Sequence, residues 1–211
     1  GRYLGRAPIS PQAQATKSCH LSFLETGIAV EIAGQHVDPA RDAATCDADW
    51  QKLLRSMGAD VAPGQCAGII VCISADQLKS NALANTTAGL QLVRQRINDL
   101  MDLARRRLPV YVMLTQVDRL DGVSTLIQQL PAVLLQQSAG ALLPYKSKSA
   151  TAYIRQSIDE LARYLPWLAL RASGQGISHA AQSGLSAARD IRTLQAPLET
   201  VLMSLFGISA Y

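Results

Sequence analysis

The stretch that decides the fold is residues 67–74, AGIIVCIS. Its unbroken apolar run has the length of a strand and is rich in β-branched residues, so it predicts a strand with both faces buried. Strands of this kind are typical of the centre of a parallel sheet that helices cover on both sides. The stretch therefore predicts an α/β fold.

Segments on both sides of this strand repeat the pattern of strands and helices. Further strands are predicted at residues 21–24 as an antiparallel edge, 27–32, 110–115 and, more briefly, 141–144. Helical periodicity fills the intervals at residues 47 or 49 to 58, 86 or 87 to 107, 123–137 with a break at Pro131, 151–165 and 191–205, where Pro197 is expected to kink the helix or start a new one. This alternation favours a mostly parallel sheet flanked by helices.

The strand signal ends after Tyr145, where Lys, Ser, Ala and Thr become frequent. We expect residues 1–145 to form the α/β domain and residues 146–211 to form a helical extension. Three glycines and several serines near residues 173–184 predict a loop within this extension.

Composition excludes several classes of protein. The net charge is 20 − 16 = +4, and 48% of the residues are hydrophobic while 17% are charged, which excludes intrinsic disorder. No basic stripe runs through the chain, so we expect no nucleic-acid partner. The longest apolar stretch is too short to cross a bilayer. The four cysteines lack the spacing of a zinc site, and they indicate a reducing compartment.

One group of candidate binding residues follows the strand at residues 27–32: Glu31, Gly34 and Gln35. P-loop nucleotide hydrolases place an Asp here to reach the magnesium shell, followed by a Gly whose backbone amide approaches the terminal phosphate. Glu31 stands where the Asp is expected. Its extra methylene displaces the carboxylate and weakens metal coordination.

A second group, Thr115, Gln116 and Asp118, follows the strand at residues 110–115. A guanine-nucleotide hydrolase has Asn/Thr-Lys-x-Asp at this place, with the Asp accepting hydrogen bonds from the base. Asp118 is retained, whereas Gln116 replaces the Lys. An Asp after a strand is also an ordinary turn or helix cap. The chain contains no GxxxxGK[ST] phosphate loop, so these residues alone do not make a catalyst.

Taken in order, the motifs resemble the cytoplasmic NTPase-like domain of the IcmF/TssM inner-membrane proteins of bacterial type VI secretion systems, which have relatives in type IVB systems. The segments that carry the resemblance are residues 16–19 (TKSC), 28–35 (IAVEIAGQ), Trp50 with Leu53 and Leu54, 67–78 (AGIIVCISADQL), 107–118 (RLPVYVMLTQVD), and 194–199 with 205–207.

The resemblance implies a P-loop NTPase-like, small-GTPase-like domain at the cytoplasmic face of the bacterial inner membrane, tethered through segments outside this chain. It implies a hetero-oligomeric complex with other type VI secretion membrane-complex and baseplate proteins. Where the family has Asp, Arg and Lys, this chain has Glu31, Gln35 and Gln116, so we expect a scaffold with a vestigial nucleotide site, no cofactor, no catalytic residue and no metal ligand.

Two alternatives remain open at this point. The first is a switch that binds or hydrolyses GTP or ATP with magnesium, using a phosphate loop upstream of residue 1. The second is an unrelated cytosolic α/β binding protein.

Overall fold

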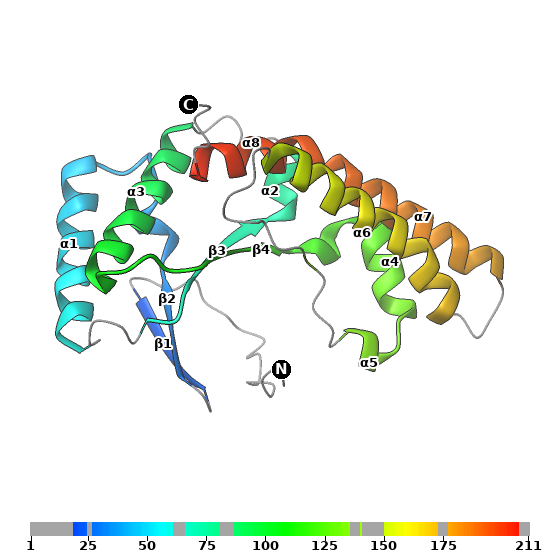
Figure 1. Cartoon of the computed structure of the whole chain (residues 1–211), viewed down its shortest axis with the longest axis horizontal. Coiled ribbons are helices and arrows are strands. Elements are labelled where there is room, and N and C mark those ends of the chain that lie inside the picture. Colours follow the sequence, from blue (N-terminus) through cyan, green and yellow to red (C-terminus); the bar gives the residue numbers. More distant parts are fainter. Residues whose placement is uncertain are drawn as a thin grey trace. The chain divides into compact units, whose positions relative to one another are not determined.

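The computed structural model describes residues 19–24, 27–60, 66–80, 87–135, 140, 150–172 and 177–206 (Figure 1). The chain forms two compact units: unit 1 holds residues up to Cys66 together with Gln95–Arg107, and unit 2 holds Ala67–Arg94 and everything from Leu108 onward. Helix α3 (Thr87–Ala104) contributes residues to both units. Within the described ranges, no helix is both long enough and apolar enough to span a bilayer.

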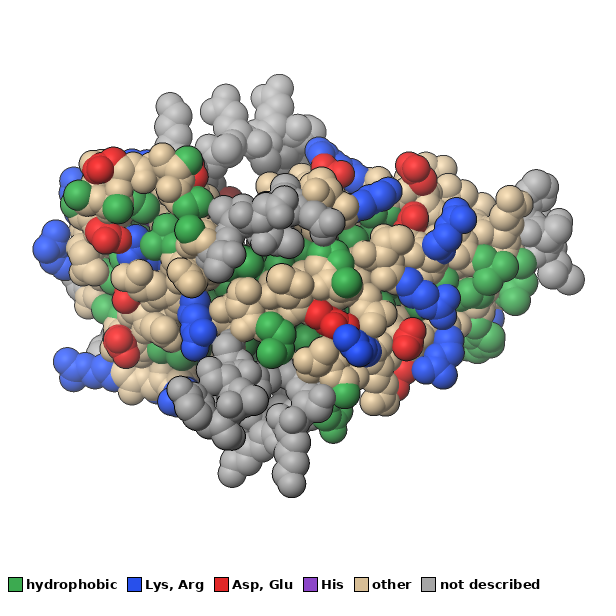
Figure 2. All heavy atoms as spheres, turned by 90° about the horizontal axis from the view of Figure 1, so that it is seen from above, with side chains coloured by type: hydrophobic (Ala, Val, Ile, Leu, Met, Phe, Trp, Pro, Cys, Tyr) green, Lys and Arg blue, Asp and Glu red, His purple; other side chains and the backbone are tan. Residues whose placement is uncertain are grey.

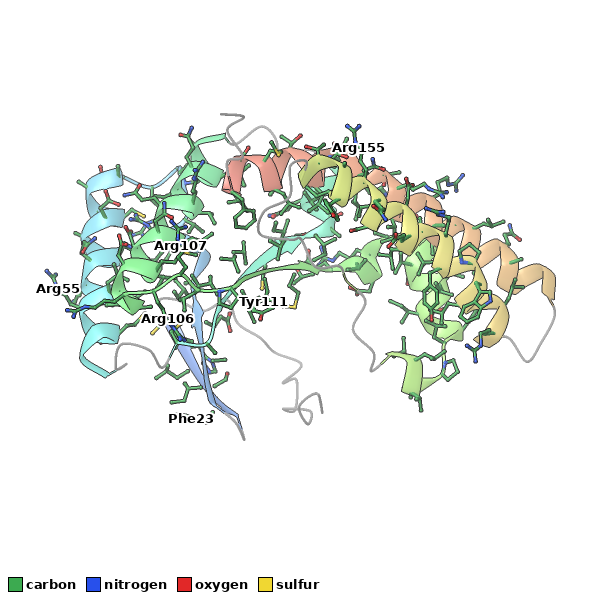
Figure 3. The ribbon with its side chains drawn as sticks, in the orientation of Figure 1. Phe23, Arg55, Arg106, Arg107, Tyr111 and Arg155 are labelled. Atoms are coloured by element: carbon green, nitrogen blue, oxygen red, sulfur yellow. The ribbon has the colours of Figure 1, made fainter. Side chains whose placement is uncertain are left out.

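Unit 1 is built from a β-hairpin and two helices. Strand β1 (Cys19–Leu24) pairs antiparallel with β2 (Gly27–Ile32), which confirms the predicted antiparallel strand. A short 3-10 turn, η1 (Gly34–His36), leads toward helix α1 (Ala43–Asp60). Phe23 pairs with Ile28 on an apolar face of the hairpin and is 78% exposed (Figure 3).

Helix α1 begins earlier than the predicted residues 47 or 49, because Asp42 caps it. The Asp42 carboxylate accepts hydrogen bonds from the backbone N–H of Thr45 at 2.9 Å and from its hydroxyl at 2.7 Å. An acidic side chain at this position satisfies backbone donors that the first helical turn leaves unpaired. The same two bonds, with the hydroxyl bond contributing most, lower the pKa of Asp42.

The sheet of unit 2 is a single parallel pair. Strands β3 (Ile69–Ser74) and β4 (Val110–Thr115) run in register, with Ile69 opposite Val110 and Ser74 opposite Thr115. The described strands thus form one antiparallel and one parallel pair, so the predicted mostly parallel sheet is confirmed only for β3 and β4. The segment at residues 141–144, predicted as a strand, lies outside the described residues.

The prediction that both faces of β3 are buried is wrong for the described residues. One face of the β3–β4 pair carries Val71, Ile73, Val112 and Leu114 into the main hydrophobic cluster. On the opposite face, Ile70, Tyr111 and Met113 are 62%, 55% and 48% exposed. An apolar run shows that each side chain suits burial, but it does not show whether helices cover both faces.

Helices make up the rest of unit 2. They are α2 (Ala75–Lys79), α4 (Asp121–Gln129), α5 (Ala132–Leu135), α6 (Ala150–Ala172), α7 (Ile177–Thr193) and α8 (Gln195–Phe206), with a 3-10 turn η2 (Val117–Arg119) before α4. The break at Pro131 is confirmed between α4 and α5. The start of a new helix near Pro197 is also confirmed, since α8 begins at Gln195 and a proline in the first turn has no hydrogen bond to lose.

The loop predicted near residues 173–184 is wrong for 177–184, which form the first half of α7. Gly184 lies within this helix, where an added Cβ would be 2.6 Å from Pro166 Cα and 2.9 Å from Ala169 Cβ. The glycine is therefore needed for close packing against α6, and it does not mark a turn. Residues 173–176 lie outside the described part of the chain, and the domain boundary between residues 145 and 146 stays a prediction.

Candidate functional site

The first predicted group lies at the carboxyl end of β2 in unit 1. Glu31 is an exposed residue of β2, and Gly34 and Gln35 follow in η1. An added Cβ at Gly34 would meet no atom within 4 Å, and the backbone there does not have the positive φ that favours glycine. Neither local packing nor backbone geometry therefore requires a glycine at position 34.

Side chains from α1, from the loop before it and from α3 hold the η1 turn in place. Arg41 donates to the Gln35 carbonyl at 3.2 Å and also pairs with Asp49 at 3.2 Å. The Cys46 thiol donates to the carbonyls of Gln35 and His36 at 3.7 and 3.6 Å. Arg96 donates to the same His36 carbonyl at 3.3 Å. The turn that would move in a nucleotide switch is thus bonded on two consecutive carbonyls.

Arg96 is the centre of these contacts, although the sequence reasoning did not single it out. It is 4% exposed, and its guanidinium lies 2.5 Å from Asp47 and 3.7 Å from Asp99. Its Cζ atom is 5.1 Å from the centroid of the Trp50 ring, and Trp50 Nε1 donates to Asp99 at 2.7 Å. The sequence signal that could have identified Arg96 is its place beside the apolar stripe of a predicted helix, with Asp99 three residues later.

An open hollow of about 330 Å³ lies beside this turn in unit 1. Gln35 and His36 line it from η1, and Lys52 and Ser56 line it from α1. The hollow therefore places one predicted residue, Gln35, next to a cation and a hydroxyl.

The second predicted group lies at the carboxyl end of β4 in unit 2. Gln116 has a left-handed backbone, with φ 57° and ψ 28°, directly after Thr115. The Ser74 hydroxyl, at the end of the neighbouring strand β3, donates to Gln116 Oε1 at 2.6 Å. The same hydroxyl accepts from the Gln77 N–H at 3.3 Å and so caps α2. A lysine in place of Gln116 has no acceptor for the Ser74 hydroxyl.

Asp118 follows in η2 and is exposed. Its neighbour Arg119 lies 3.8 Å from Asp76, and both of these side chains are largely exposed. The carboxylate of Asp118 is thus open to solvent and available as a hydrogen-bond acceptor, but Gln116 beside it is bonded within the sheet.

These residues do not fit a complete nucleotide and magnesium site. The sequence has no phosphate loop, and the residue at the lysine position of the base-binding motif links two strands. Within the described ranges, no three His, Cys, Asp or Glu side chains are placed to hold a metal ion. The two groups belong to different compact units.

The comparisons with known proteins agree on a family. A family model described as the IcmF-related N-terminal domain matches residues 44–211. A curated relative, the type VI secretion system component TssM1 of Pseudomonas aeruginosa, is 27% identical over 107 residues, which cover 51% of this chain and 10% of that protein. The chain thus spans about a tenth of the relative's length, and no solved structure matches it. The chain belongs to the family of IcmF-related N-terminal domains.

Proposed function

We propose that this chain is a scaffold domain of a type VI secretion membrane complex and that its nucleotide-site motifs are vestigial. Its family and its similarity to a protein named as a type VI secretion component support the secretion role. In this proposal the domain has a P-loop NTPase-like fold, lies at the cytoplasmic face of the inner membrane and contacts other membrane-complex and baseplate proteins.

The observation that carries the scaffold role is the bonded η1 turn. A nucleotide switch exchanges one set of loop contacts for another when the terminal phosphate is lost. Here a movement of η1 breaks the bond from Arg96 to the His36 carbonyl and disturbs a buried cation that also contacts Asp47 and Asp99. A hydrogen bond that involves a charged group contributes about 1.5 to 3 kcal/mol. Such a turn suits a fixed surface better than a moving one.

The carboxyl end of β4 supports the same proposal independently. In a base-binding site the lysine stem and the aspartate act on one ligand. In this chain Gln116 accepts a hydrogen bond from Ser74 and ties β4 to β3. The bond stabilises the strand ends and commits the Gln116 amide oxygen to Ser74.

A nucleotide titration separates the scaffold from the switch. The whole protein, together with any residues that precede residue 1, is titrated with fluorescent GTP and ATP analogues in the presence of magnesium, and we expect no saturable binding. The matched variants are Asp118→Asn, which removes the carboxylate of the motif, and Arg55→Glu, which changes an exposed charge on α1 (Figure 3). Micromolar binding that Asp118→Asn abolishes and Arg55→Glu preserves contradicts the scaffold proposal and supports the switch.

A second experiment tests the complex directly. A photo-crosslinking amino acid replaces Phe23 or Tyr111, which are both exposed apolar residues, and replaces the buried Leu126 in the control. In cells that assemble the secretion system, we expect crosslinks to other membrane-complex proteins from an exposed position and none from Leu126. Equal labelling from all three positions, or labelling of unrelated abundant proteins alone, contradicts the proposal.

A further inference from the structure

The outward side of the α6–α7 hairpin carries an exposed apolar surface in unit 2. On α6, Tyr164, Trp167 and Leu170 are 45%, 47% and 42% exposed over two turns. On α7, Leu185 is 61% exposed. We call these four side chains the hairpin patch, together with Arg163 and Arg171 of α6 and Arg189 of α7. Large apolar side chains that gather on a surface mark binding sites more often than scattered ones do.

The two helices that carry the patch are in direct contact. Gly184 of α7 packs against Pro166 and Ala169 of α6, so the residue after Gly184 lies beside the turn of α6 that carries Trp167. In Figure 2, green apolar and blue basic side chains, with some red acidic ones among them, cover the part of the molecule that holds α6 and α7. The patch is therefore presented by a closely packed pair of helices.

The aromatic part of the patch is already ordered. The ring centroids of Tyr164 and Trp167 are 5.3 Å apart, and the Arg171 guanidinium lies over the Trp167 ring with Cζ 4.7 Å from its centroid. Ring and cation–π contacts of this kind favour these rotamers over others, which reduces the entropic cost of association.

The charge of the patch is one-sided. Between Glu160 and Asp190 the sequence contains three arginines and no acidic residue. The carboxylates at the two ends of this stretch keep their charge, and each accepts a hydrogen bond from a neutral donor: Glu160 from Gln156 and Asp190 from the Gly122 N–H. In the described part of the chain, none of the three arginines pairs with a carboxylate. The complementary partner is therefore an anionic one.

We propose that the hairpin patch docks on the surface of an anionic lipid bilayer. Trp and Tyr rings favour the level of the lipid headgroups, leucines enter the boundary of the acyl chains, and arginines bind the lipid phosphates. The patch offers all three kinds of side chain and no acidic group. This inference goes beyond the scaffold role and stands on the surface of α6 and α7 alone.

Vesicle flotation with the whole 211-residue chain tests the proposal. We expect the chain to float with vesicles of phosphatidylcholine and phosphatidylglycerol, to stay behind with phosphatidylcholine alone, and to bind less as salt is added. Trp167→Ser and the double variant Arg163→Glu with Arg171→Glu are expected to weaken binding by about tenfold or more, because each arginine near an anionic surface contributes about fivefold.

Two variants serve as matched controls. Tyr153→Ser removes an aromatic side chain of α6 that is 42% exposed but lies about 16 Å along the helix from Tyr164. Arg55→Glu reverses an exposed charge on α1 (Figure 3). Both controls are expected to bind as the natural chain does. Equal losses in the controls and in the patch variants overturn the proposal.

A spectroscopic measurement needs no variant. The chain has two tryptophans, of which Trp50 is 1% exposed and Trp167 is 47% exposed. Anionic vesicles that contain brominated lipid are expected to quench the accessible tryptophan and shift its emission to the blue. Absence of quenching, or binding to a polyglutamate peptide without binding to anionic vesicles, overturns the proposal in favour of an acidic protein partner or no partner.

Discussion

Replacing Gly122 with alanine tests how closely α4 packs against α7. Gly122 is the second residue of α4, and an added Cβ would lie 2.4 Å from the Ser186 carbonyl carbon, 2.5 Å from the Ala187 nitrogen and 2.7 Å from the Ser186 oxygen. All three atoms belong to the backbone of α7, so no side chain can rotate to relieve the clash. The two helices must separate by about 1 Å to restore ordinary van der Waals contact.

The cost of this separation exceeds the gain from alanine. Overpacking costs about 1 to 3 kcal/mol, and the separation also stretches the 2.7 Å hydrogen bond from the Gly122 N–H to Asp190, which contributes about 1.5 kcal/mol or more. Alanine returns at most about 1 kcal/mol through its higher helix propensity. We therefore expect a net loss of about 2.5 kcal/mol, which lowers Tm by about 5 to 10 °C in a chain of this size.

The assay is thermal and urea unfolding of three alanine variants. Gly122→Ala is compared with Gly34→Ala, where the added Cβ meets no atom within 4 Å and the change is expected to stay within about 0.5 kcal/mol. Gly184→Ala, whose Cβ would lie 2.6 Å from Pro166 Cα, is expected between the two because a mid-helix position gains more from alanine. If Gly122→Ala and Gly34→Ala unfold at the same temperature, the packing argument is refuted.

Three further changes probe the other contacts. Arg96→Met is expected to lower the free energy of unfolding in urea by about 3 kcal/mol. This is near the low end for a broken buried ion pair, because the Asp47 side chain is 55% exposed. The same variant is expected to speed hydrogen exchange in η1, and unchanged exchange contradicts the role of Arg96 as an anchor of that turn. Arg105 ends α3 with φ 52°, so Arg105→Gly is expected to raise stability by about 1 kcal/mol in thermal unfolding, and a lower Tm contradicts that reasoning. Arg155 (Figure 3) donates two hydrogen bonds of 2.9 and 3.1 Å to Glu199 and so holds the pKa of this carboxyl below its usual range. The stability that the Glu199 carboxylate contributes is therefore present above the pKa that it has in the unfolded chain, and it is lost as pH falls. The stability difference from Glu199→Gln is therefore expected to shrink between about pH 5 and pH 3 in urea unfolding, and a difference that does not change with pH counts against the pair.

Local patterns predicted most of the helices and strands. The strands Gly27–Ile32 and Val110–Thr115 occur with the predicted bounds, and the breaks at Pro131 and near Pro197 occur where a missing backbone N–H requires them. The start of α1 was missed because a cap depends on one side chain, Asp42, and not on periodicity. These features are decided within a few residues of the chain, so a single sequence contains the signal.

Errors arose where distant segments meet. The glycine at position 184 suggested a loop, yet the close approach of Pro166 explains it, and nothing in the residues near Gly184 indicates that neighbour. The run at β3 suggested two buried faces, but burial depends on which helices cover the sheet. Arg96 was overlooked because its partners Asp47 and Trp50 are more than 40 residues away in the sequence.

The candidate site divides in the same way. The order of the motifs along residues 16–207, which include Glu31, Gly34, Thr115 and Asp118, determined the family resemblance, since residue type and spacing are properties of the chain itself. Only the tertiary structure decided that Gln116 bonds to Ser74 across two parallel strands and that a buried arginine holds η1. Hydrogen bonds and buried charges depend on distances between segments far apart in sequence, and folding alone brings those segments together.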